Sequence, residues 1–148
     1  MFKNLLIAAS LSTGFAASAL AQPMDVAKNA GCGCCGGWIE QMQAAGFEVV
    51  ARNISNEALY ELKLSLGIGE EMMSCHTASV EGYSIEGHVP LVDIRRLLAE
   101  RPDAVGLAVP GMPVGSPGME YGDMKDAYDV FLIGRDGSTE VFASYAGN

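Results

Sequence analysis

Three of the four cysteines in this 148-residue sequence lie within one run of four residues, and the fourth stands beside a histidine. The first three, Cys32, Cys34 and Cys35, occur in the glycine-rich run GCGCCGG, whereas Cys75 is followed at once by His76. The run precedes a predicted helix, whose free N–H groups and dipole favour thiolates over thiols. Clustered thiolates suit two kinds of chemistry, dithiol redox exchange and the binding of a soft metal ion.

The middle cysteine of the run, Cys34, separates these two uses. Redox exchange of the thioredoxin type needs two sulfurs, here Cys32 and Cys35, and a third thiol between them would be a competing partner. Cu(I) prefers thiolates and thioethers, and thiolates can bridge neighbouring ions, so three crowded sulfurs favour copper. Structural zinc sites usually take their ligands from spaced pairs, and this run fits that pattern poorly.

Structural disulfides are a third interpretation of the four cysteines. A bond between the neighbours Cys34 and Cys35 would be strained, so Cys75 would bond to one of them and Cys32 to the other. The sequence favours metal binding, and redox exchange and structural disulfides stay open as alternatives.

Further soft donors occur later in the chain. His88 lies in the run EGHVP, and a repeated Pro-Gly-Met places Met112 and Met119 in one proline-stiffened loop. Thioethers select Cu(I) over harder ions, so both methionines are candidate ligands. The alternatives are a capping or solvent-facing histidine and methionines that fill gaps in the core. Met72 and Met73, next to Cys75, are interpreted as packing residues.

Composition and the N-terminus narrow the class of protein. The 18 acidic residues outnumber the 9 basic ones, and the net charge of −9 excludes a general nucleic-acid binder. Residues 1–21 combine Lys3, an apolar run and an A-x-A site, which predicts a signal peptide. We expect a single exported domain over 22–148, soluble in a bacterial periplasm, with no later stretch long enough to span a membrane.

Apolar spacing and turn residues predict the elements that position these side chains. Strands are expected at 24–29, 47–54, two within 77–86, 129–133 and 139–145. Helices are expected at 36–45, from a cap at Ser55 or Asn56 to Gly67, and from Pro90 to Arg101. Residues 106–122, rich in glycine and proline, are expected to form an irregular loop. The order is typical of an α/β fold with a thioredoxin-like core and an added C-terminal β-hairpin.

The blocks GCGCCGG, SCHT, EGHVP and PGMPVGSPGME in combination resemble a bacterial family long catalogued as predicted metal-binding proteins of unknown function. Exported members of that family include a copper-resistance protein. The resemblance covers nearly all of 22–148 and implies a thioredoxin-like fold, a periplasmic location and a role in copper tolerance. It places candidate metal ligands at Cys32, Cys34, Cys35, Cys75, His76, His88, Met112 and Met119.

The resulting hypothesis is an exported protein that binds copper, as Cu(I), through clustered thiolates and contributes to copper resistance or homeostasis. Thiolates that bridge would allow more than one ion. Its expected partners are copper ions and other periplasmic copper-handling proteins. The alternative is a periplasmic thiol–disulfide or copper oxidoreductase that uses Cys32 and Cys35. No catalytic residue is assigned, since the sequence lacks the G-x-S-x-G, H-E-x-x-H and phosphate-loop motifs.

Overall fold

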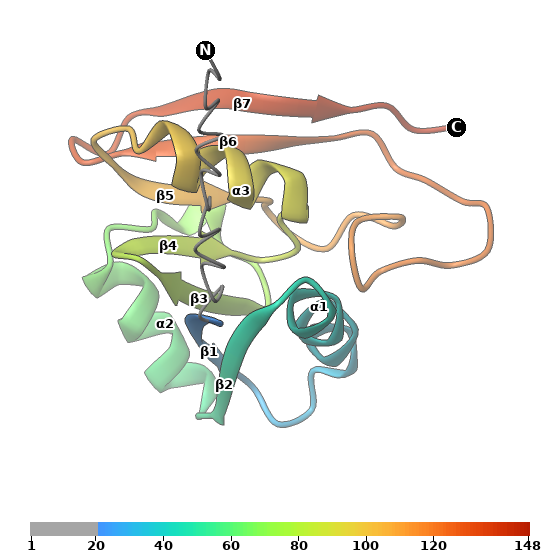
Figure 1. The fold of residues 1–148 in the computed structure, drawn as a ribbon, viewed down its shortest axis with the longest axis horizontal. Coiled ribbons are helices and arrows are strands. Elements are labelled where there is room, and N and C mark those ends of the chain that lie inside the picture. The colour runs from blue at the N-terminus through green and yellow to red at the C-terminus, as the bar shows by residue number, and fades with distance from the viewer. Residues whose placement is uncertain (1–20) are drawn as a thin grey trace, which may run out of the picture.

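The computed structural model of the protein describes residues 21–148 (Figure 1). The expected signal peptide at 1–21 therefore lies, except for Ala21, outside the described residues. The described part is a mixed α/β structure in which three α-helices pack on one seven-stranded sheet. Within 21–148, no helix combines the length and hydropathy needed to cross a bilayer.

Strands and helices alternate over the first four elements, two strands later follow each other directly, and three strands come after the last helix (Figure 1). Their bounds are β1 (Gln22–Lys28), α1 (Gly33–Ala44), β2 (Phe47–Asn53), α2 (Asn56–Ser65), the 3-10 turn η1 (Glu70–Met72), β3 (His76–Val80), β4 (Tyr83–Glu86), α3 (Leu91–Glu100), β5 (Ala104–Ala108), β6 (Tyr128–Gly134) and β7 (Thr139–Tyr145).

The sheet has the strand order β2-β1-β3-β4-β5-β6-β7. Strands β1 and β2 are parallel, as are β4 and β5, whereas β3 runs antiparallel to both β1 and β4. The last two strands, β6 and β7, pair antiparallel across a short turn at 135–138. Because β1 and β3 are antiparallel neighbours, the end of β1 lies beside the start of β3, where Lys28 pairs with His76.

The two faces of the sheet carry different helices. The main core joins Trp38 of α1 and Ile94 of α3 to sheet residues that include Ala78. Because successive side chains of a strand point to opposite faces, Thr77 must face away from this core. Lys63 of α2 donates a hydrogen bond to the Thr77 hydroxyl, so α2 covers the second face.

Most elements lie within two or three residues of their predicted bounds, and Ser55 caps α2 as expected. Its hydroxyl oxygen accepts a hydrogen bond from the Ala58 N–H at 3.1 Å. Pro90 stands one residue earlier than expected, at the N-cap of α3 instead of inside its first turn.

The prediction of an irregular loop from residue 106 was wrong at its start, because β5 continues to Ala108. This strand lies between β4 and β6 and is buried on both faces, so it lacks the alternation of polar and apolar residues that marks a half-exposed strand. Gly106 also obscured it, since glycine is depleted in strands. Here glycine is required, because an added Cβ would collide with the carbonyl oxygen of Ser84.

Candidate metal centre

The first turn of α1 presents the cysteine run. The helix begins at Gly33, three residues earlier than predicted, with Cys32 at its N-cap. A turn fixes this start, because the Asn29 side chain accepts from the Gly31 N–H at 2.7 Å and the Asn29 carbonyl accepts from the Cys32 N–H at 3.2 Å. The glycines of the run weaken helix propensity, which is why the sequence pattern placed the start too late.

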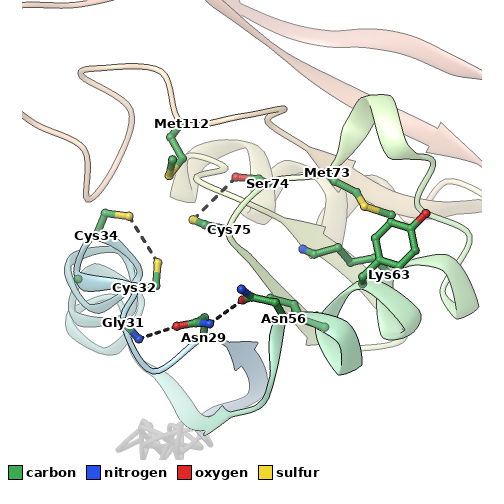
Figure 2. A pocket seen from close by; sticks show the side chains of 13 residues that line it. Asn29, Gly31, Cys32, Cys34, Asn56, Lys63, Met73, Ser74, Cys75 and Met112 are labelled. Carbon is green, nitrogen blue, oxygen red and sulfur yellow. Dashed lines mark hydrogen bonds between the residues drawn. The ribbon is translucent and has the colours of Figure 1, made fainter.

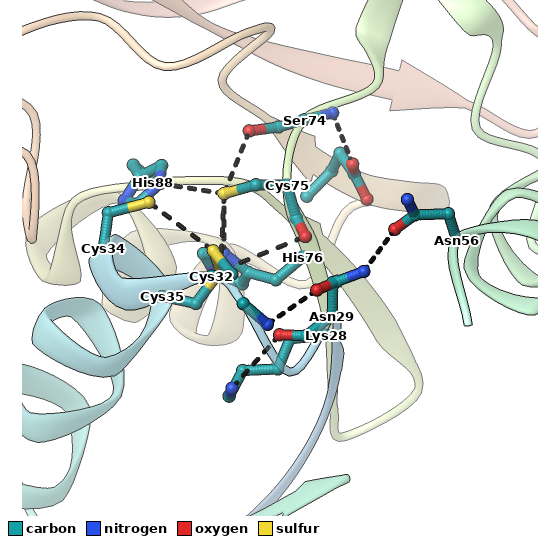
Figure 3. Close-up of a disulfide and its surroundings, with 12 residues drawn as sticks. Lys28, Asn29, Cys32, Cys34, Cys35, Asn56, Ser74, Cys75, His76 and His88 are labelled. Carbon is teal, nitrogen blue, oxygen red and sulfur yellow. Dashed lines mark hydrogen bonds between the residues drawn. A yellow bond between two sulfur atoms is a disulfide. The ribbon is translucent and has the colours of Figure 1, made fainter. Parts of the chain in front are cut away.

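The loop before β3 brings the fourth cysteine to this turn (Figure 3). Cys35 is fully buried, and its sulfur lies 3.5 Å from the sulfur of Cys75. On the other side of the group, the sulfurs of Cys32 and Cys34 are also 3.5 Å apart. All four sulfurs lie within 4.8 Å of one another, so residues 40 positions apart form one cluster.

Cys32 and Cys35 are joined as a disulfide, and Cys34 and Cys75 are free. The Cys32–Cys35 bond belongs to one of the two disulfide pairings left open above, the one in which Cys75 bonds to Cys34, and it joins the two cysteines that the redox alternative uses. The second bond of that pairing, between Cys34 and Cys75, is absent. The observed bond closes one helical turn, with a Cα–Cα distance of 5.4 Å.

Two imidazoles face Cys75 from the other side (Figure 3). The Cys75 sulfur lies 3.0 Å from Nε2 of His88 and 3.4 Å from Nδ1 of His76. Nδ1 of His88 lies 2.8 Å from the carbonyl oxygen of Pro117, which can only accept, so Nδ1 carries the hydrogen. The lone pair of His88 is therefore on Nε2 and points toward Cys75, the arrangement that a metal-binding histidine requires.

Burial controls the protonation of this group. It lowers the pKa of His76 to about 3, with a further contribution from His88, and it also lowers the pKa of His88. Both rings therefore stay neutral at physiological pH. Burial, together with the nearby Cys34, raises the pKa of the Cys75 thiol to about 11. A metal ion that binds Cys75 must therefore displace a proton.

Aromatic packing shields the inner side of the centre. The rings of Trp38 and His76 lie 4.6 Å apart, and the indole N–H donates to the Val89 carbonyl at 2.9 Å. Trp38 and His76 are both fully buried. Nε2 of His76 is the buried side-chain nitrogen or oxygen that lacks a hydrogen-bond partner in the part of the chain described here.

An open cleft of about 590 Å³ leads to the outer side of the centre (Figure 2). Cys32, Cys34 and Cys75 all line it. Met112 stands at its rim, 53% exposed, with its thioether turned toward the cysteines in Figure 2. Met119 is half-buried in the same loop and is not among the residues that line the cleft. The two methionines predicted together thus occupy different surroundings.

Sequence reasoning missed the polar residues beneath the centre. Lys63 and Glu86 form a buried ion pair, and Thr77 bonds to both. The available signal was charge inside otherwise apolar stretches, because Glu86 ends a fully buried strand. Pro117 could not be recognised as a partner, since its carbonyl group carries no signature in the sequence.

Acid is expected to destabilise the reduced, metal-free protein through His76. In the unfolded chain this ring gains a proton below pH 6.5, whereas in the folded protein it stays neutral down to a pH of about 3. This contribution to stability is therefore complete above pH 6.5 and is lost as the pH falls toward 3, at about 1.4 kcal/mol per pH unit. Urea unfolding at pH 7 and pH 5 measures it, and we expect a loss of about 2 kcal/mol.

The matched variant for this test is His76→Phe, which keeps a ring against Trp38 and cannot titrate. Carboxylates contribute equally to the pH dependence of both proteins, so the difference between them isolates His76. An equal loss of stability in the two proteins would show that His76 does not control the acid response.

Fold and site together define a mixed α/β domain that gathers three further sulfurs and two imidazoles around the Cys75 thiol. Two solved structures of the copper resistance protein copG are similar to it. Form 1 is 47% identical, with a TM-score of 0.80, and the match covers 86% of this chain and 99% of that one. Form 2 is also 47% identical, with a TM-score of 0.78 and coverages of 84% and 98%. This chain belongs to the copG family of copper resistance proteins.

A family model described as a protein of unknown function, DUF411, matches residues 72–119. That segment contains Cys75, both histidines and both candidate methionines of the loop. No significant match was found among curated proteins. The family and the cysteine cluster together indicate a copper-related function.

Proposed function

We propose that this protein is exported to the periplasm, binds Cu(I) through its four cysteines and contributes there to copper resistance. The observation that supports it most strongly is the convergence on Cys75 of two donor groups, one of four sulfurs and one with His76 and His88. Thiolate, thioether and imidazole are the donors that copper ions take. Hard ions such as Ca²⁺ and Mg²⁺ prefer carboxylates, and none belongs to either donor group.

The ligand set we propose is the four cysteines with His76 and His88, and with the Met112 thioether at the cleft. Because Cys75 belongs to both donor groups, its thiolate can bridge two ions, one on each side. Binding by all four sulfurs requires that the Cys32–Cys35 disulfide first be reduced, which takes two electrons and two protons and leaves two thiols. Met119 is a less favourable candidate, since it does not line the cleft.

The strand order supports a thioredoxin-like core. Strands β2-β1-β3-β4, with β1 and β2 parallel and β3 antiparallel between β1 and β4, carry the cysteine run between β1 and α1. On this view β5 and the C-terminal pair β6 and β7 extend the core. The three cysteines of the run then lie at a helix N-terminus, where thiolates form more readily than elsewhere.

Anaerobic titration of the reduced protein with Cu(I), against a competing chelator, tests the proposal. We expect the wild type to bind more than one ion tightly. In Cys34→Ser we expect the affinity to fall by about tenfold or the stoichiometry to fall by one ion. The protein with its Cys32–Cys35 bond intact should bind more weakly, because two of the four thiolates are absent. Unchanged stoichiometry and affinity in Cys34→Ser would defeat the shared thiolate site.

The matched control is Gly36→Ala in the same helical turn, where an added Cβ meets no atom within 4 Å. It should bind Cu(I) as the wild type does. The location is tested separately, by fractionation of cells and N-terminal sequencing of the exported chain, which we expect to begin at Gln22.

A further inference from the structure

A buried ion pair lies directly beneath the loop that carries Cys75. The side chains of Lys63 and Glu86 are 4% and 0% exposed, and the Lys63 ammonium donates to Oε1 of Glu86. The Thr77 hydroxyl accepts from Lys63 at 2.9 Å and donates to Oε2 of Glu86 at 2.6 Å. The backbone N–H of Ser74 donates to Oε1 at 2.6 Å. Both oxygens of Glu86 thus accept, as an ionised carboxylate does.

Such a pair is not explained by stability. Burial raises the pKa of the Glu86 carboxyl, and the contacts with Lys63 and Thr77 oppose that rise. Replacing a buried ion pair with apolar residues of similar volume is often neutral or stabilising, so the pair itself adds little to the free energy of unfolding. The pair instead holds the Glu86 carboxylate in place as a hydrogen-bond acceptor for Ser74, the residue that precedes Cys75.

The position of this acceptor connects the two halves of the copper site. Glu86 is the last residue of β4 and precedes His88 by two positions, whereas Ser74 precedes Cys75. Gly87, between Glu86 and His88 in the sequence, has a φ of +70°, and an added Cβ there would lie 2.5 Å from the Ser74 Cβ. The two segments therefore touch, and the Ser74–Glu86 bond fixes how Cys75 meets His88.

Glu86 and Thr77 lie on the opposite face of the sheet from His76. His76 faces α1 together with Ala78, whereas Thr77 and its cross-strand partner Glu86 face α2. Lys63, on α2, bonds to Glu86 and Thr77 on that face and also lines the open cleft beside Cys75. Figure 2 shows Lys63 extending from its helix toward the loop of Ser74 and Cys75.

We infer that Glu86 is a positioning residue for the copper site: its carboxylate, held by Lys63 and Thr77, anchors the Ser74 N–H and so sets Cys75 against His88. This inference rests on the proposed function for its copper readout. The anchoring itself is a property of the metal-free protein and can be measured there.

Two double variants separate the acceptor from the buried charge. Lys63→Met with Glu86→Gln removes both charges and keeps an amide oxygen for the Ser74 N–H. Lys63→Met with Glu86→Leu removes the charges and the acceptor. We expect the first to bind Cu(I) within about threefold of the wild type and the second to bind about tenfold or more weakly.

A second readout uses the metal-free protein with its Cys32–Cys35 bond intact. Alkylation of Cys75 by a maleimide, located by peptide mass mapping, should be about threefold or more faster in the leucine variant than in the glutamine variant, because the loop is released. If Glu86 contributed only to stability, both variants would change in unfolding temperature. Their Cys75 alkylation rates, measured below that temperature, would then be equal. Equal rates and equal affinities in the two doubles, or an equal loss in both, would overturn the inference.

Thr77→Val covers the case in which the leucine variant does not fold. It removes both hydrogen bonds of the hydroxyl and keeps the ion pair, so Cys75 alkylation should accelerate in the same direction; an unchanged rate would overturn the inference. Asp103→Asn, which breaks an exposed ion pair with Arg135, is the control and should change neither readout. A wild type that fails to bind Cu(I) would defeat the proposed function, whereas the alkylation rates would still decide the positioning role.

Discussion

Replacing Cys75 by serine is expected to lower the affinity of the reduced protein for Cu(I) by about a hundredfold or more, a larger loss than for Cys34→Ser. The reason is that the Cys75 sulfur belongs to both donor groups. It lies 3.5 Å from Cys35 on one side and 3.0 Å from His88 on the other. Its removal therefore takes one ligand from each proposed ion at once. Competition titration with a Cu(I) chelator under anaerobic conditions measures the change.

The control for this experiment is Met72→Leu, three residues away in the sequence. Met72 is buried in the smaller core cluster with Ile68, and a volume-conserving change there should leave the affinity within about threefold of the wild type. If Cys75→Ser binds Cu(I) as tightly as Cys34→Ser does, Cys75 is not shared between two ions. If it binds as tightly as the wild type, Cys75 is not a ligand.

Gly118→Ala is expected to lower the free energy of unfolding by about 3 kcal/mol. Gly118 has a φ of +82°, and an added Cβ would lie 2.6 Å from the backbone nitrogen of Trp38 and 2.8 Å from the carbonyl oxygen of Cys34. The loop would have to withdraw from the first turns of α1. Pro117, the adjacent residue, would then lose its hydrogen bond with His88, so Cu(I) affinity should fall by about tenfold as well.

Gly122→Ala separates the steric effect from the backbone effect. Gly122 lies in the same loop with a φ of +56°, but an added Cβ would meet no atom within 4 Å. Gly122→Ala should lower the free energy of unfolding by only about 1 kcal/mol, because alanine must adopt the left-handed backbone conformation there, and it should leave copper binding unchanged. Urea unfolding and the chelator titration measure both variants. Equal destabilisation of the two would show that the loop does not need its close approach to α1.

The group around Cys75 and the ion pair of Lys63 and Glu86 differ in charge. Around Cys75 the imidazoles are neutral and the thiol is protonated in the metal-free protein, because burial penalises their charged forms. On the other face of the sheet, the side chains of Lys63 and Glu86 form a buried ion pair. The side proposed to bind copper thus carries lone pairs and displaceable protons, and the opposite side carries a fixed ion pair.

Local patterns in the sequence determined the donor types and most of the elements. The run GCGCCGG and the dipeptide Cys75-His76 indicate soft-metal ligands by composition alone. The apolar spacing of Trp38 and Met42 gave the helix that follows, and the Glu81-Gly82 turn gave the β3 and β4 pair. These features depend on neighbours within a few residues, where periodicity and turn chemistry act.

Tertiary structure decided everything that depends on distant segments. It placed Cys75 against Cys35 and turned Met112 but not Met119 toward the cleft. It also inserted β5 as an interior strand, whose burial on both faces removes the alternation by which a strand is recognised.

The atoms that orient the candidate ligands were likewise decided by the tertiary structure. The Pro117 carbonyl that sets the His88 tautomer, and the Glu86 carboxylate that anchors Ser74, act across 29 and 12 positions of the chain. Backbone carbonyls are the same in every sequence, and a lone charged residue does not name its partner. The sequence by itself therefore determined which atoms could bind a metal. Only the fold decided which of them meet, because contacts between distant segments form through packing and not through local pattern.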